Sequence, residues 1–150
     1  MRELTGYIKE SIERSNLEYI GVTLNDESKK LLQELFNKYN PWKDQNIKII
    51  CHHMTVAHKT NINDDLYKWS LVNTNKEYNL TVTHYGWSNK AFAVKVETNV
   101  PSANENKHVT CAINIDKKGK PVDSNYINNW KKIDDNIILT GFVKPNYKMK

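Results

Sequence analysis

Two segments of this chain share one pattern, a histidine and a threonine two positions apart within an otherwise apolar run. The segments are residues 51–57, with the sequence CHHMTVA, and residues 107–113, with the sequence KHVTCAI. Side chains of a β-strand alternate between its two faces, so residues at positions i and i+2 share a face. The pattern therefore predicts two strands, each with an apolar face toward the core and a His-Thr pair facing away from it.

If these two strands lie near one another, their polar side chains form one site from His53, Thr55, His108 and Thr110. A neutral histidine, with an ordinary pKa near ~6.5, accepts a proton, and a protonated one donates it. Threonine hydroxyls can donate hydrogen bonds to the nonbridging oxygens of a phosphate as charge develops. The residues predict acid–base chemistry on a phosphate ester without a metal or other cofactor. They leave open which histidine is the acid.

Other groupings of these residues are less favoured. His58 and Thr60 repeat the spacing, but they lie where the strand enters a polar loop, so we interpret them as a chance match. A zinc site could draw on Cys51, His52, His53 and His58, and it needs four converging ligands. Strand alternation places Cys51 with His53 but turns His52 and His58 to the other face, which argues against zinc.

Composition sets limits on the class of protein. The length of 150 residues fits one domain, residues 1–150, with a sizeable core. The formal net charge of +5 suits a partner that carries phosphate. No apolar run approaches the ~20 residues of a membrane span, and the first ten residues do not resemble a signal peptide. We expect a cytoplasmic protein without a membrane partner, and reduced thiols at Cys51 and Cys111.

Hydrophobic periodicity predicts the order of elements. The expected elements are a helix over 3–14, a strand over 18–24, a helix capped by Asn25 or Asp26 and ended by Asn40-Pro41, a strand over 47–57, a short strand or helical turn over 66–73, a hairpin of strands 78–85 and 91–97, a strand over 107–115, a short helix capped by Asp123 or Ser124, and a last strand over 137–143. Short links and few helices indicate an α+β domain with a largely antiparallel sheet.

The doubled apolar-His-x-Thr-apolar motif, in a small chain that opens with Tyr19-Ile-Gly-Val-Thr23, resembles the two-histidine (2H) phosphoesterase superfamily over roughly residues 18–143. Residues 82–96 are similar to its tRNA-ligase-like branch. The resemblance implies a bilobal α+β fold, with two antiparallel sheets around a central cleft and helices on the outside. It also implies that His53, Thr55, His108 and Thr110 are catalytic. Members include RNA 2′,3′-cyclic phosphodiesterases, cyclic-phosphodiesterase domains of tRNA ligases, viral 2′-5′-oligoadenylate-cleaving enzymes and phage anti-CBASS nucleases.

The expected function is a metal-independent phosphodiesterase that acts on a nucleotide or oligonucleotide, without an obligate protein partner. If the chain is viral, it would act in the host cytoplasm. The alternative is a non-catalytic RNA- or nucleotide-binding module that keeps the same cleft.

Candidate substrate contacts lie outside the motifs. Tyr19 lies on the outward face of its strand and could stack on a base. Trp87 at a hairpin tip could also reach a base, and Lys144 and Tyr147 of the C-terminal tail could close over a phosphate. The other three tryptophans are expected to pack in the core or against helices; they are Trp42, Trp69 and Trp130.

Overall fold

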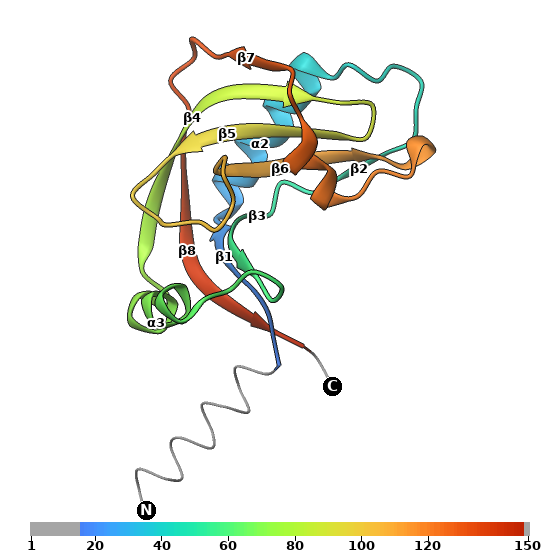
Figure 1. Cartoon of the computed structure of the whole chain (residues 1–150). Coiled ribbons are helices and arrows are strands. Elements are labelled where there is room, and N and C mark those ends of the chain that lie inside the picture. The colour runs from blue at the N-terminus through green and yellow to red at the C-terminus, as the bar shows by residue number, and fades with distance from the viewer. Residues whose placement is uncertain (1–15, 149–150) are drawn as a thin grey trace, which may run out of the picture.

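In the computed structural model, which describes residues 16–148, six strands pair around a closed antiparallel barrel (Figure 1). The order around the barrel is β3 (His53–His58), β1 (Leu17–Leu24), β8 (Ile138–Tyr147), β4 (Glu77–Trp87), β5 (Ala91–Glu97) and β6 (His108–Asn114), which pairs again with β3. Two short strands extend it: β2 (Ile47–Ile49) pairs with β6, and β7 (Trp130–Lys132) pairs with β4.

Apolar side chains fill the interior of the barrel, because each strand alternates between an inner and an outer face. The fully buried inner residues include Ile20, Val22, Met54, Val56, Leu80, Val94, Val109 and Leu139. The outer face of β3 carries His53 and Thr55, and the outer face of β6 carries His108 and Thr110, opposite the inner Met54 and Val109. Both His-Thr pairs therefore lie outside the barrel.

Among the described residues, two α-helices pack against this barrel: α2 (Asp26–Tyr39) and α3 (Asp64–Asn73). Figure 1 shows α2 behind β5 and β6, where Leu32, Leu35 and Phe36 are buried. The predicted cap is present, since the Asn25 side chain accepts a hydrogen bond from the Ser28 N–H at 2.9 Å. Within residues 16–148, no helix is long and apolar enough to cross a membrane.

The expected bilobal fold of two antiparallel sheets around a central cleft is wrong. One strand, β8, pairs with both β1 and β4, and another, β6, pairs with both β5 and β3, so the ladders continue around the barrel. Alternation identifies strands but says nothing about their partners. Closure removes the exposed strand edges that two open sheets would leave.

The first motif strand is also interrupted. Residues 47–57 were expected to form one strand, but they form two, β2 and β3, with a break between them. Cys51 lies in this break and has a positive φ of 43°. The break cancels the predicted alternation, and Cys51 is fully buried instead of sharing the outer face of His53. Its thiol is free, as is that of Cys111.

Other local differences concern boundaries. Residues 66–73 were expected to form a short strand or a helical turn, and residues 64–73 form the helix α3. Its cap is the Asn63 side chain, which accepts a hydrogen bond from the Leu66 N–H at 2.8 Å. The short helix expected after Asp123 or Ser124 is instead the 3₁₀ helix η2 (Pro121–Tyr126), which follows a second 3₁₀ turn, η1 (Ile115–Lys117). The last strand continues to Tyr147. The helix predicted over 3–14 lies outside the described residues.

Candidate active site

Both His-Thr pairs line one cavity on the outside of the barrel, with a volume of about 510 Å³. They meet because β3 and β6 are antiparallel neighbours, with Met54 opposite Val109 where the barrel closes. The structure therefore brings together the four predicted residues, His53, Thr55, His108 and Thr110. One wall is η2, which contributes Pro121 and Val122 and covers β6.

Strand β1 forms the opposite wall through Tyr19, whose ring stacks on His53 with centroids 4.6 Å apart and an angle of 22°. Gly21 lies between them. A Cβ on this glycine would lie 3.1 Å from Cδ2 of His53 and 3.2 Å from Cε2 of Tyr19. Glycine thus lets the two rings stack at this separation. Burial raises the pKa of Tyr19, so the phenol stays neutral around pH 7.

His53 is held in its neutral form. Burial, and then the neighbouring charges of His52 and His108, lower its pKa to about 4. Its Nδ1 lies 2.9 Å from Nδ1 of His52, so one of these two nitrogens donates a hydrogen bond to the other. Burial and the charge of Lys29 lower the pKa of His52 as well. The second nitrogen of His53, Nε2, is left for a ligand.

His108 has a different partner. Its Nδ1 lies 2.8 Å from the carbonyl oxygen of Asn106, and a carbonyl only accepts, so Nδ1 carries a proton. Burial lowers the pKa of His108, and this hydrogen bond partly opposes that effect. Because Nδ1 is occupied, Nε2 is the nitrogen left to exchange a proton with a ligand.

The two threonines also differ. The Thr55 hydroxyl has no hydrogen-bond partner among the described residues, whereas Oγ1 of Thr110 lies 2.7 Å from Oγ of Ser124. Ser124 belongs to η2 and is 2% exposed. Oγ1 of Thr110 also donates to the Pro121 carbonyl oxygen at 3.5 Å, a long hydrogen bond. If Ser124 donates the shorter bond, the hydroxyl proton of Thr110 can turn from Pro121 to a phosphate oxygen.

Three of the other expected substrate contacts lie outside the cavity. Trp87 stacks on Tyr85 at the end of β4, and it lines a different groove with Trp42. Lys144 and Tyr147 lie on β8 and are not among the residues that line the cavity. Of the four expected substrate contacts, Tyr19 is the one that lines the cavity, among the residues described.

The pair set aside as a chance match does reach the cavity. His58 and Thr60 line its outer end with Asn61, beside Tyr19, because β3 continues in the same direction past Thr55. Their spacing alone gave no sign of this, since it depends on the loop that follows β3. They belong to the wall of the cavity rather than to the two motifs.

The group considered for zinc does not converge. The Cys51 thiol lies in the core and donates to the Cys111 carbonyl oxygen at 3.3 Å. Over residues 16–148, no three His, Cys, Asp or Glu side chains are placed to hold a metal ion.

Sequence reasoning missed three residues that contact the motif side chains. His52 was assigned to the opposite face from His53, and it reaches His53 because it precedes the strand instead of belonging to it. Asn106 acts through its carbonyl group, which any residue has. Ser124 was read as a helix cap, and only the folding of η2 over β6 brings it to Thr110. No sequence pattern distinguishes these roles.

No family model matches the sequence, and no curated protein matches it. Among solved structures, the chain is similar to a fungal RNA kinase, with a TM-score of 0.64 and 12% identity over 88% of this chain and 46% of that one. The chain thus spans about half the length of that protein, and the likeness concerns the fold alone. The expected assignment to the 2H phosphoesterase superfamily is wrong, because the chain forms a closed barrel, similar to part of the RNA kinase, and not the bilobal fold.

Proposed function

We propose that this protein hydrolyses a phosphodiester bond of a nucleotide or oligonucleotide, using His53 and His108 as base and acid without a metal ion. The supporting observation is the single cavity that two imidazoles and two threonine hydroxyls line together. This set contains a proton acceptor, a proton donor and hydroxyl donors for the phosphate oxygens. The excess of basic residues, a formal charge of +5, favours an anionic substrate.

The surroundings of the two histidines support one assignment of these roles. His53, with its pKa lowered to about 4, is neutral across the physiological range and accepts a proton at Nε2. Nε2 can accept a proton only when the proton of the neutral ring is on Nδ1, so Nδ1 of His53 donates to Nδ1 of His52. His108 is the acid, because the Asn106 carbonyl favours its protonated form while Nε2 faces the cavity.

The reaction balances with these groups alone. Water attacks phosphorus as its proton passes to Nε2 of His53, and the bond from phosphorus to the leaving oxygen breaks as Nε2 of His108 protonates that oxygen. The products are a phosphomonoester and an alcohol, and solvent restores the two protonation states. Thr55 and Thr110 donate hydrogen bonds to the nonbridging oxygens, where negative charge accumulates.

The test is a substrate panel assayed in EDTA, with wild type, His53→Ala and His108→Ala. The panel contains 2′,3′-cyclic mononucleotides, 3′-5′ and 2′-5′ dinucleotides, and cyclic di- and trinucleotides. We expect turnover by the wild type and a loss of at least about 100-fold in each variant, the scale of general acid–base catalysis.

His84→Ala is the matched control, because His84 lies on β4 and bonds to Thr83 away from this cavity. It should retain full activity. Wild-type rates in both motif variants would contradict the proposal, and so would activity that EDTA abolishes. Binding of a panel member without turnover would favour the non-catalytic nucleotide-binding module.

A further inference from the structure

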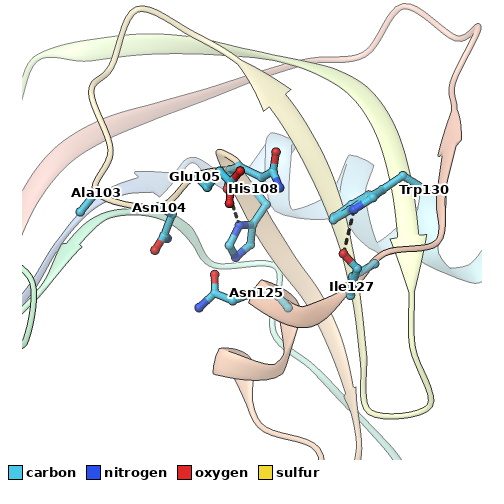
Figure 2. Close-up of a pocket in the computed structure, with 9 residues that line it drawn as sticks. Ala103, Asn104, Glu105, His108, Asn125, Ile127 and Trp130 are labelled. Atoms are coloured by element: carbon cyan, nitrogen blue, oxygen red, sulfur yellow. Dashed lines mark hydrogen bonds between the residues drawn. The ribbon is translucent and has the colours of Figure 1, made fainter.

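A second cavity adjoins the first on the far side of His108. It has a volume of about 210 Å³ and lies between the loop before β6 and the segment from Ser124 to Trp130. Asn104, His108 and Asn125 line both cavities, so the two cavities adjoin at these residues. Figure 2 shows the amides of Asn104 and Asn125 on one side of the His108 ring and the indole of Trp130 on the other. The second cavity therefore extends the site beyond His108.

Unpaired amides and a fixed indole form this second cavity. The side-chain amides of Asn104, Asn106 and Asn125 make no hydrogen bond within the described part of the chain, and each offers both a donor and an acceptor. Trp130 is held in place, since its Nε1 donates to the Ile127 carbonyl oxygen at 3.0 Å. Amides that pair with base edges and a flat apolar wall suit a nucleobase.

The charge of the second cavity argues against another phosphate. Glu105 is the charged residue in its described lining, which contains neither Lys nor Arg. Lys95 lies outside this lining, with its Nζ 4.7 Å from the centroid of the Trp130 ring. A carboxylate repels a phosphate but accepts hydrogen bonds from the amino groups of bases and from ribose hydroxyls. The occupant is therefore the uncharged part of a nucleotide, its base and sugar.

We propose that the second cavity binds the nucleoside on the leaving-group side of the scissile phosphate. The substrate is then a phosphodiester that links two nucleosides, in a linear or cyclic oligonucleotide, and not a terminal 2′,3′-cyclic phosphate. This inference rests on the proposed function, because the second cavity begins at His108, the acid that protonates the leaving oxygen. The other nucleoside lies at the Tyr19 end of the first cavity.

The test compares a dinucleoside monophosphate with its analogue that lacks the base on the leaving nucleoside. Both have the same phosphodiester and the same leaving hydroxyl, so they differ only in the group assigned to the second cavity. Each is made with a 3′-5′ and with a 2′-5′ linkage. For the wild type, we expect kcat/KM to be at least about tenfold higher for the linkage with both bases, the upper range for one hydrogen bond.

Asn125→Ala should remove most of this preference, so that its kcat/KM values for the two substrates become similar. Asn128→Ala is the matched control, because Asn128 is an exposed asparagine three positions away that lines neither cavity. It should keep the wild-type preference.

The outcomes separate the two proposals. Equal wild-type kcat/KM for the two substrates, or faster opening of a 2′,3′-cyclic mononucleotide, would overturn this inference and leave the phosphodiesterase function standing. Failure of the wild type to cleave any member of the panel, or full activity of His53→Ala, would overturn the function itself.

Discussion

At the scale of single residues, the site places two histidines in unlike surroundings. His53 lies against Tyr19 and His52, and its pKa is about 4, whereas His108 donates to a carbonyl group that partly offsets the effect of burial. One site thus holds an imidazole that stays neutral and a second imidazole that more readily takes up a proton.

This difference predicts an acidic pH optimum. The base must be neutral, so kcat/KM rises with pH through the His53 pKa of about 4. The acid must be protonated, so kcat/KM falls as pH rises through the His108 pKa, which burial lowers from its ordinary 6.5. A bell-shaped profile of kcat/KM with its maximum below pH 6.5 is expected. A rate that keeps increasing toward pH 8 would contradict the assignment.

Ser124 should act on the reaction through Thr110. Ser124→Ala removes the 2.7 Å hydrogen bond that orients the Thr110 hydroxyl. We expect kcat to fall roughly fivefold to tenfold, the scale of one hydrogen bond, with KM little changed. Steady-state kinetics of Ser124→Ala, Thr110→Ala and the double variant measure this effect, which should be smaller in the Thr110→Ala background.

The matched control for this prediction is Ser70→Ala, which changes another buried serine, in α3, whose hydroxyl donates to the Tyr67 carbonyl oxygen. It should not alter kcat. Additive effects of the Ser124 and Thr110 substitutions would show that Ser124 does not act through Thr110.

At the scale of elements, strand alternation predicted the orientation of the motifs but not the path of their strands. The face of β1 that carries Tyr19 and Gly21 follows directly from period two. The break at Cys51 does not, because a positive φ in a non-glycine residue reflects tertiary constraints and has no local signature here. His52 reaches His53 only because of that break.

Glycines of neighbouring strands should respond differently to substitution. In Gly21→Ala, the new Cβ lies 3.1 Å from Cδ2 of His53, 3.1 Å from the Met54 carbonyl oxygen and 3.2 Å from Cε2 of Tyr19, so a shift of a few tenths of an ångström relieves it. In Gly141→Ala, it meets the Thr23 carbonyl oxygen at 2.7 Å, and the backbone must move. We expect Gly21→Ala to lower kcat/KM severalfold with a small loss of stability.

For Gly141→Ala, we expect the free energy of unfolding to fall by about 1–3 kcal/mol, as for an overpacked core. Urea unfolding and kinetics of both variants provide the check. The opposite order, with Gly21→Ala the less stable variant and fully active, would show that the separation of Tyr19 and His53 does not matter for catalysis.

At the scale of the whole molecule, the site lies across the seam where the barrel closes. β3 and β6 share one registered pair, Met54 with Val109, whereas β1 and β8 pair along most of their length. Each strand of the seam carries one His-Thr pair, so the two halves of the site keep their relative positions only while this seam is closed.

The seam should therefore open before the rest of the barrel. We expect amide hydrogens of residues 51–55 and 108–110 to exchange faster than those of β1 and β8. A bound, uncleaved dinucleotide should slow them, because it contacts both strands. Hydrogen exchange measured by mass spectrometry tests this. Seam amides as protected as those of β1 in the free protein would contradict it.

The closed barrel itself could not be predicted from this sequence. The antiparallel strands and most of their limits follow from alternation and turn residues, and so does the grouping of His53, Thr55, His108 and Thr110. Pairing of β6 with both β5 and β3 depends on long-range contacts that the strand sequences do not encode locally. The second cavity is equally hidden, since Asn104 lies outside every predicted element and Asn125 lies in a predicted short helix.

The most direct test of the central claim is the rate of dinucleotide hydrolysis in EDTA by the wild type, His53→Ala and His84→Ala. If His53 is the base, the wild type and His84→Ala cleave at similar rates, and His53→Ala is at least about 100-fold slower although it folds normally. Equal rates in all three proteins, or no cleavage by the wild type, would contradict the assignment of this site as a phosphodiesterase active site.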